Sequence, residues 1–426
     1  MPTAWRAPLT AILAALAVAG AAADAVAEPS WPSYHRDAGR SGLDPESAGP
    51  AAPTLAWHSS DLGAPIWGQP LVLGSRVYVA TVGDDLYALE AATGAIIWHQ
   101  HVGTPVPSSA LPCGDITPTV GIVGTPVIDP ALHEIFAVAD TWDGSHAHHQ
   151  LVGYDLTTGA ERLRTSVDPP GAEPTALLQR TALNLDAGRV VFGFGGNDGD
   201  CGTYLGAVVA APEAGGAPSF WQVPIAVKSK AGGAVWGPSG PAVDAEGHIF
   251  ASTGNPDPRG ERATVYDDSD SVVELSSELA LIGHFEPPSW ETDSNNDTDL
   301  GSAGPELLPG ALLFQAGKSG TGYLIAESTM GTGAEAVYSH QVCGGAASFG
   351  GDAFAAGVIY VACSNGVQAL AYDEAARSFT PLWKGPGDAA GPPIVSAGLV
   401  WVVATHASTP GSKLYGLDPA TGSTRY

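Results

Sequence analysis

Residues 86–98 read LYALEAATGAIIW, and the core of this pattern returns twice further along the chain. Residues 151–159 read LVGYDLTTG, and residues 414–422 read LYGLDPATG. In each copy an apolar run ends at an acidic residue, and Thr-Gly follows three positions later. The acidic side chain can cap a tight turn, and glycine can adopt the positive φ that such a turn needs. Repetition of this kind predicts a repeat architecture.

The sequence between these copies has the pattern of an all-β protein. The chain has 55 Gly and 35 Pro, which interrupt short apolar runs such as residues 77–80 and 400–403. Each unit reads as a four-stranded sheet, and such a sheet buries its two faces only by stacking against neighbouring units around a channel. We therefore predict a single β-propeller. Seven innermost strands are expected near Pro70, Pro126, Thr181, Pro241, Pro305, Asp352 and Pro393.

The first residues have the form of a secretory signal. Arg6 precedes an apolar run over residues 11–23, and residues 25–27 read AVA, a cleavage-site pattern. We expect a signal peptide over 1–27, an N-terminal extension over 28–52 and one propeller domain over 53–426. No later apolar run has the roughly twenty residues that a bilayer span requires. The sequence thus predicts a secreted, periplasmic or cell-surface protein.

The charge balance excludes one class of partner. The formal net charge is −27, with only 17 Lys and Arg in 426 residues. This excess of negative charge repels phosphate backbones and anionic membrane surfaces. Nucleic acid is therefore not an expected partner.

The unit Ala-Leu-x-x-x-Thr-Gly followed by tryptophan resembles the repeat of the pyrroloquinoline quinone (PQQ) propellers over nearly the whole mature chain. That family includes quinoprotein alcohol dehydrogenases such as polyvinyl alcohol dehydrogenase, and noncatalytic relatives such as the outer-membrane assembly lipoprotein. The resemblance implies a PQQ- and calcium-dependent dehydrogenase of small or polymeric alcohols with a separate electron acceptor. The alternative is a noncatalytic scaffold that binds a protein or polysaccharide at the cell surface.

Three segments resemble the cofactor site of the dehydrogenases. Asn255 lies in a Gly-Asn-Pro segment and is the candidate calcium ligand, since an amide oxygen is a hard donor. Trp236 precedes Gly237 and is the candidate platform under the quinone ring. Lys318 lies in the segment whose cation contacts the quinone oxygens.

Three further residues follow from the same resemblance. Asp299 precedes an innermost strand where these enzymes place their catalytic base, and it is also a candidate metal ligand. Arg180 could add a cofactor contact. Asp200 falls near the position of the family's calcium-binding glutamate and would be a shorter substitute for it.

The chain also departs from the family. No two cysteines are adjacent, and there is no Cys-x-x-Cys-His motif, so we expect no attached haem. Structural alternatives remain open: Trp236 can be a core aromatic, and Asn255 a turn residue. The loop 293–299 alternates oxygen donors, but Thr298 stands where a calcium-binding EF-hand needs glycine.

A histidine cluster has a second candidate metal spacing. His146, His148 and His149 lie in a loop rich in Gly and Asp. A solvated hairpin tip explains this pattern better than a zinc site.

The four cysteines form an even set, for which three pairings are possible in an exported protein. Cys343 and Cys363 flank two strands of one blade, so a local disulfide is expected there. Cys113 and Cys201 would then join two long loops near the channel mouth. Each bridge requires α-carbons about 5 to 6 Å apart.

The first and last blades raise the question of how the ring closes. Residues 55–63 match residues 97–103, so an outer strand is expected there without inner strands before it. Residues 421–426 begin a further outer strand, with Tyr426 at the tryptophan position. Because related propellers commonly have eight blades, we expect an eight-bladed type that is incomplete at the C-terminus. The alternative is a closed seven-bladed ring, with the Trp57 strand beside residues 414–417.

Overall fold

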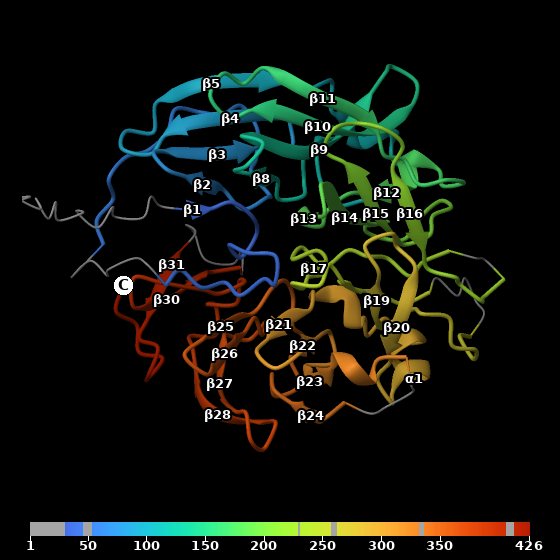
Figure 1. Cartoon of the computed structure of the whole chain (residues 1–426), viewed down its shortest axis with the longest axis vertical. Helices are drawn as coiled ribbons and strands as arrows, with labels where there is room; N and C mark the ends of the chain where they lie inside the picture. Colours follow the sequence, from blue (N-terminus) through green and yellow to red (C-terminus); the bar gives the residue numbers. More distant parts are fainter. Residues whose placement is uncertain (1–29, 46–52, 229–230, 257–261, 332–335, 406–412) are drawn as a thin grey trace, which may run out of the picture.

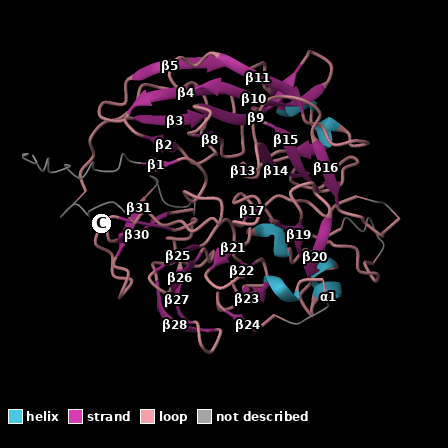
Figure 2. Cartoon of the chain, in the orientation of Figure 1, coloured by secondary structure: helices cyan, strands magenta, loops and turns pink. Residues whose placement is uncertain are grey.

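The computed structural model describes residues 30–45, 53–228, 231–256, 262–331, 336–405 and 413–426. In this part of the chain the regular secondary structure is almost entirely β, joined by long loops, with one short helix, α1 (Trp290–Ser294), and a few 3-10 turns (Figure 2). The sheets form seven blades arranged radially (Figure 1). The predicted signal peptide lies outside these residues. No helix among them is long and apolar enough to cross a membrane.

Six blades have four antiparallel strands in chain order from the channel outward, and blade 7 has three. Blade 1 is β2 (Leu71–Leu73), β3 (Arg76–Ala80), β4 (Asp85–Glu90) and β5 (Ile96–His101). Blade 2 is β8 (Val127–Asp129), β9 (Glu134–Trp142), β10 (Ala147–Asp155) and β11 (Glu161–Ser166). Blade 3 is β13 (Asn184–Asp186), β14 (Arg189–Gly196), β15 (Ala207–Pro212) and β16 (Ser219–Gln222), with β12 (Leu177–Leu178) also on β14.

Blade 4 is β17 (Ala242–Val243), β18 (Ile249–Ser252), β19 (Val272–Leu275) and β20 (Leu281–Phe285). Blade 5 is β21 (Glu306–Leu308), β22 (Leu312–Ala316), β23 (Thr321–Ala326) and β24 (Tyr338–Gln341). Blade 6 is β25 (Ala353–Ala355), β26 (Val358–Val361), β27 (Gln368–Asp373) and β28 (Ser378–Lys384). Blade 7 is β29 (Ile394–Ser396), β30 (Leu399–Val403) and β31 (Leu414–Leu417), and a small ribbon joins β6 (Val106–Pro107) to β7 (Thr119–Val120).

These innermost strands follow the positions marked in the sequence, so the predicted all-β propeller of seven visible blades is confirmed. The repeat turn behaves as expected. The Asp155 carboxylate accepts hydrogen bonds from the backbone N–H of Thr157 and Thr158, and Gly159 has φ of 69°. The indole of Trp98, from blade 1, packs against Gly159 and donates to the carbonyl of Leu156 at 3.0 Å. Each Thr-Gly turn is thus a docking point for the preceding blade.

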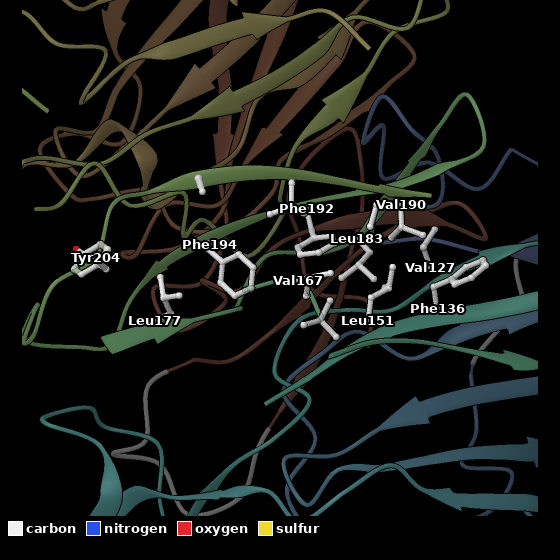
Figure 3. Close-up of a cluster of buried hydrophobic side chains, with 14 of the residues drawn as sticks. Val127, Phe136, Leu151, Val167, Leu177, Leu183, Val190, Phe192, Phe194 and Tyr204 are labelled. Carbon is white, nitrogen blue, oxygen red and sulfur yellow. The ribbon is translucent and has the colours of Figure 1, made fainter. Parts of the chain in front are cut away.

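The blades are held together by apolar cores between their facing sheets. Between blades 2 and 3, Phe192 and Phe194 of β14 lie with Phe136 and Leu151 in one buried cluster (Figure 3). All four side chains are fully buried. Each contributes roughly 1.5 to 3 kcal/mol relative to an exposed position, which makes these junctions the main source of stability.

The described part of the predicted N-terminal extension runs through the channel and contacts the innermost strand of every blade. β1 (Ser30–Trp31) pairs with β2, and the Ala38 carbonyl accepts from the Asn184 side chain of blade 3. Backbone N–H groups of the other five innermost strands donate to carbonyls of this segment at 2.8 to 3.0 Å: Ile128 to Pro32, Val243 to Ala38, Leu307 to Gly39, Phe354 to Ser41 and Val395 to Gly42. The segment therefore fastens the blades from inside.

The region around Trp57 does not form the predicted strand. Residues 53–62 are described, and none of them belongs to a β-ladder. The Trp57 indole instead packs against Gly94 and donates to the Ala91 carbonyl at 2.8 Å, as Trp98 does one blade later. The N–H groups of Arg425 and Tyr426 both donate to the Gly416 carbonyl. An eighth blade is not among the described residues, so the eight-bladed ring stays a prediction.

Both predicted disulfides are present. Cys113 pairs with Cys201 at a Cα separation of 5.9 Å, and Cys343 pairs with Cys363 at 5.4 Å. The first joins the loop after β6 to the loop after β14. The second lies buried between blades 5 and 6.

Candidate functional site

A pocket of about 460 Å³ lies at the end of the channel where the innermost strands begin. All six residues that the sequence pointed to line this one pocket: Arg180, Asp200, Trp236, Asn255, Asp299 and Lys318. They come from blades 3, 4 and 5 and their connecting loops. Their roles are not established by this arrangement, but the fold brings them within reach of a single ligand.

Trp236 forms the centre of the pocket floor. It precedes β17 and is only partly buried. The Arg180 guanidinium lies 5.3 Å from the centre of the indole, and the Lys318 ammonium lies 5.4 Å from it. An indole flanked by two cations is a cation–π arrangement. A planar ligand with negative charge would find both a stacking surface and two counter-charges here.

Lys318, on the turn between β22 and β23, is held by two carboxylates. Its Nζ lies 2.5 Å from Oδ2 of Asp299 and 2.6 Å from Oδ1 of Asp297. The Asn255 backbone N–H donates to the other Asp299 oxygen, Oδ1, at 2.7 Å. Gly254 makes this approach possible, because a Cβ there would lie 2.7 Å from Asp299 Oδ1.

Burial and neighbouring charges together set the acid–base properties of these groups. It raises the pKa of Asp299, and the nearby Lys318 ammonium and the Asn255 N–H oppose that rise. Burial lowers the pKa of Lys318, but Asp299 and Asp297 outweigh it, so the net pKa is raised. Asp270 lies behind Asp299, and burial together with the Asp299 charge raises its pKa well above the usual range. Lys318 thus keeps its charge, and burial makes the Asp299 carboxylate a stronger base.

Arg180 differs from Lys318 in having no direct acceptor. Among the described residues, none forms a hydrogen bond or ion pair with its guanidinium. Burial lowers its pKa, while the charges of Asp115 and Asp198 act on it from a distance and oppose that effect. A buried cation without a contacting anion is costly, and a ligand that supplies one would be bound strongly.

Asp200 lines the same pocket as Asn255 and Asp299. It has φ of 51°, and the Tyr204 hydroxyl donates to its Oδ1 at 2.5 Å. The disulfide between Cys113 and the adjacent Cys201 fixes this part of the loop.

The oxygen donors do not form a calcium site by themselves. Calcium takes six to eight oxygen ligands. Both oxygens of Asp299 are already engaged, by Lys318 and by the Asn255 N–H. No group of three His, Cys, Asp or Glu side chains in the described part of the chain is placed to hold a metal ion.

The histidine cluster divides into two environments. His146 and His148 are exposed and lie near Asp143. His149 is buried, with its Nδ1 2.6 Å from Asp168. The three rings do not converge, in agreement with a hairpin tip.

The pocket residues that were not selected from the sequence include Trp67, Asp115, Asp198 and Tyr204. Three of them lie in loops without a family motif, and only Asp198 lies beside a selected residue. A weak signal existed, because Asp115 and Asp198 are close to cysteines predicted to pair. A second weak signal was the position of Trp67, a tryptophan in a loop just before an innermost strand.

Comparison with known proteins gives three groups of relatives. The family described as outer membrane protein assembly factor BamB matches residues 48–257. Two polyvinylalcohol dehydrogenases are each 25% identical: that of Pseudomonas sp over 234 residues and that of Sphingopyxis sp. (strain 113P3) over 237. Each alignment covers 50% of this chain, but only 33% and 32% of the relatives, so the match spans about a third of their length.

Solved structures extend the likeness to the whole fold. A quinohemoprotein alcohol dehydrogenase from Pseudomonas putida HK5 superposes with a TM-score of 0.70, covering 93% of this chain and 71% of its own. The enzyme from Comamonas testosteroni gives 0.66, covering 94% and 73%. A europium-containing methanol dehydrogenase gives 0.66, covering 93% and 84%. All three are 15% identical to this chain, which shows a shared fold alone.

Proposed function

The chain belongs to the PQQ-repeat β-propellers, and from that premise we propose that its channel pocket binds PQQ and uses it to oxidise alcohols. One observation carries the proposal. Trp236 offers an aromatic face with Arg180 and Lys318 beside it, in a pocket that also holds a buried carboxylate, Asp299. The relatives named as polyvinylalcohol and quinohemoprotein alcohol dehydrogenases support it.

The residues present suit a planar polyanion. The indole of Trp236 provides a stacking surface. Arg180 has no direct acceptor among the described residues, so a ligand carboxylate would supply the missing partner. Lys318 is a point charge that can turn toward a ring oxygen while one of its two carboxylates still contacts it. Bound PQQ would supply an acceptor for the hydride that leaves the alcohol carbon.

The chain's own contribution is proton transfer and positioning. Asp299 is the base: its Oδ2 would take the hydroxyl proton as the C–H bond breaks, leaving a carbonyl product. Burial raises the pKa of Asp299 and so strengthens that base, while the Lys318 charge opposes the rise. The Asn255 N–H fixes the carboxylate through Oδ1, and Oδ2, which contacts the Lys318 ammonium at 2.5 Å, would face the substrate once Lys318 turns toward a ring oxygen of the ligand.

Calcium has no step in this mechanism, because the described donors do not form a site for it. The family resemblance still predicts it, with Asn255, Asp299 and Asp200 as the ligands the chain would offer. Measuring PQQ affinity after chelation, with and without added calcium, tests that prediction. Export likewise rests on the signal-like residues 1–27.

The proposal is tested in two stages. PQQ is first titrated into purified protein while tryptophan fluorescence is followed, and saturable quenching is expected. Dye reduction is then measured with primary alcohols, secondary alcohols and polyvinyl alcohol. Asp299→Asn should still bind PQQ but lose about 100-fold or more of the turnover. Asp297→Asn is the matched control, since Asp297 contacts the same lysine from an exposed position.

The alternative is a noncatalytic scaffold for a protein or polysaccharide. The match to the assembly-factor family favours it over half of the chain. Absence of PQQ binding in the first stage would reject the enzyme and leave the scaffold.

A further inference from the structure

The pocket has its positive charge on the floor and its negative charge around the mouth. The two cations, Arg180 and Lys318, lie against Trp236. Four exposed aspartates line the same pocket further out: Asp115, Asp198, Asp200 and Asp297. A planar anion bound on the floor would neutralise the cations. An incoming substrate would then meet these four carboxylates.

Two of these carboxylates are not engaged by the protein. Asp115 and Asp198 form no ion pair or hydrogen bond with any described residue. They influence Arg180 only through space. The net charge of −27 places these two groups in a field that favours cations and disfavours anions.

An exposed tryptophan lies among them. Trp67 lines the pocket and leaves 47% of its surface exposed. A large aromatic ring left open in a pocket indicates a binding surface. A ring face beside carboxylates is the combination that binds alkylammonium groups.

We propose that the substrate alcohol carries a positive charge close to its hydroxyl group, as amino alcohols and quaternary ammonium alcohols do. The cation would lie between Trp67 and the carboxylates of Asp115 and Asp198, with the hydroxyl directed inward to Asp299. The inference rests on the proposed function, because it needs a floor already occupied by an anion. The chemistry is unchanged: the hydride and its two electrons go to the bound quinone, and the hydroxyl proton goes to Asp299.

Three alcohols of similar size isolate the charge. Choline is the cation, 3,3-dimethylbutan-1-ol has the same shape without charge, and 3-hydroxypropanoate is the anion. With PQQ-loaded protein and an electron-accepting dye, kcat/KM for choline should exceed that for the neutral alcohol by about tenfold at low ionic strength. The ratio should shrink in 0.5 M salt, and the anion should be the poorest substrate. A higher kcat/KM for the neutral or anionic alcohol would overturn the inference.

Variants at the mouth attribute the preference to named groups. Asp115→Asn and Asp198→Asn should each lower the choline to neutral-alcohol ratio about threefold, and Trp67→Ala should lower it as well. Glu374→Gln, on the outside of blade 6, is the control and should leave the ratio unchanged. Equal ratios in the three mouth variants and the control would contradict the assignment.

A binding measurement separates this inference from the proposed function. Calorimetric titration of choline and of 3,3-dimethylbutan-1-ol into the protein needs no turnover. One outcome is that no alcohol is oxidised, but choline binds more tightly than 3,3-dimethylbutan-1-ol and Asp198→Asn weakens choline binding. In that case the cation site stands and the dehydrogenase proposal fails. If PQQ binds and alcohols are oxidised but choline shows no advantage, the dehydrogenase stands and the cation site fails.

Discussion

Two arginines lie in the same channel, and their surroundings differ in one respect. Arg40, on the N-terminal segment, is 1% exposed and donates to the carbonyls of Tyr34, Leu183 and Pro241 at 3.0 to 3.2 Å. Arg180, on the pocket floor, has the Trp236 ring beside it and no acceptor among the described residues.

The difference separates a structural cation from a binding one. Arg40 donates to carbonyls of the N-terminal segment and of the residues just before the innermost strands of blades 3 and 4, so its guanidinium helps to hold the channel together. Arg180 keeps its donors unused, and a buried cation of that kind is stabilised only when a ligand provides an anion. Charge alone would not distinguish the two residues. Arg40 is buried and has carbonyl acceptors, whereas Arg180 is partly buried and has no acceptor among the described residues.

The largest expected effect is the loss of Arg40. Arg40→Met should lower the free energy of unfolding by about 4 kcal/mol, because several buried carbonyls lose their donor. Chemical denaturation followed by fluorescence measures it. Arg162→Met, an exposed arginine paired with Asp155, should cost less than about 1 kcal/mol. A loss for Arg40→Met as small as that of Arg162→Met would remove the distinction between the two sites.

The second prediction concerns a buried acid beside the N-terminal segment. Burial raises the pKa of Asp352 from 3.8 to about 7. The folded protein therefore binds the proton of the Asp352 carboxyl group more tightly than the unfolded chain does. The stability that this proton contributes is fully present below about pH 4 and is lost as pH rises to about 7.

Asp352→Asn should remove that dependence while keeping an acceptor for the Ala362 N–H. The unfolding free energies of the two proteins should diverge between pH 4 and 7 by an amount on the order of 4 kcal/mol in favour of the variant. The divergence should stop above pH 7. Denaturation curves at unit pH intervals measure it, and parallel curves would show that the carboxyl is not held protonated.

Arg180 should behave oppositely to Arg40. Arg180→Met should weaken PQQ binding about 100-fold, because a charge-assisted contact to a carboxylate is lost. Its free energy of unfolding should stay the same or rise, since an unpaired buried charge is removed. Fluorescence titration and denaturation give the two values. A fall in stability like that of Arg40→Met would place Arg180 among the structural cations.

The smallest expected effect concerns Tyr34, and it tests whether a change in the N-terminal segment leaves binding at the pocket floor unaffected. The Tyr34 hydroxyl accepts the Gly351 N–H at 3.1 Å, and burial raises its pKa. Tyr34→Phe should lower the free energy of unfolding by about 1 kcal/mol through the loss of that acceptor. PQQ affinity should not change. The exposed Tyr426→Phe is the control, and an equal effect in both variants would mean that the channel hydrogen bond contributes nothing.

Much of the fold could be predicted from the sequence because its signals are local. The Asp155 and Gly159 turn forms through side chains a few residues apart, and the same turn recurs in other blades. The segment around Trp57 carries the pattern of an outer strand, but a strand also needs a neighbour to pair with. The described residues provide no such neighbouring strand. Of the predicted features, only the packing of the Trp57 indole on the next turn is observed.

The site was predictable in part. The motifs around Trp236, Asn255, Asp299 and Lys318 located residues that the fold does bring together. Trp67 and Asp115 lie in loops of blades 1 and 2, far along the chain from that cluster, and only weak sequence signals, an innermost strand after Trp67 and a predicted disulfide beside Asp115, point to them. The Lys318 contact with two aspartates depends on how the loop before β21 returns to the turn after β22.

The sequence by itself determined the repeat, the position of each innermost strand and both disulfide pairings, because each of these depends on spacing along the chain. Tertiary structure alone decided that Arg40 has acceptors and that Arg180 has none among the described residues, since the Leu183 and Pro241 carbonyls lie more than a hundred residues along the chain from Arg40. It also decided that the N-terminal segment contacts all seven blades. Hydrogen bonding is short-ranged, so whether a buried charge is satisfied depends on distances of about 3 Å that only the closed arrangement of blades sets.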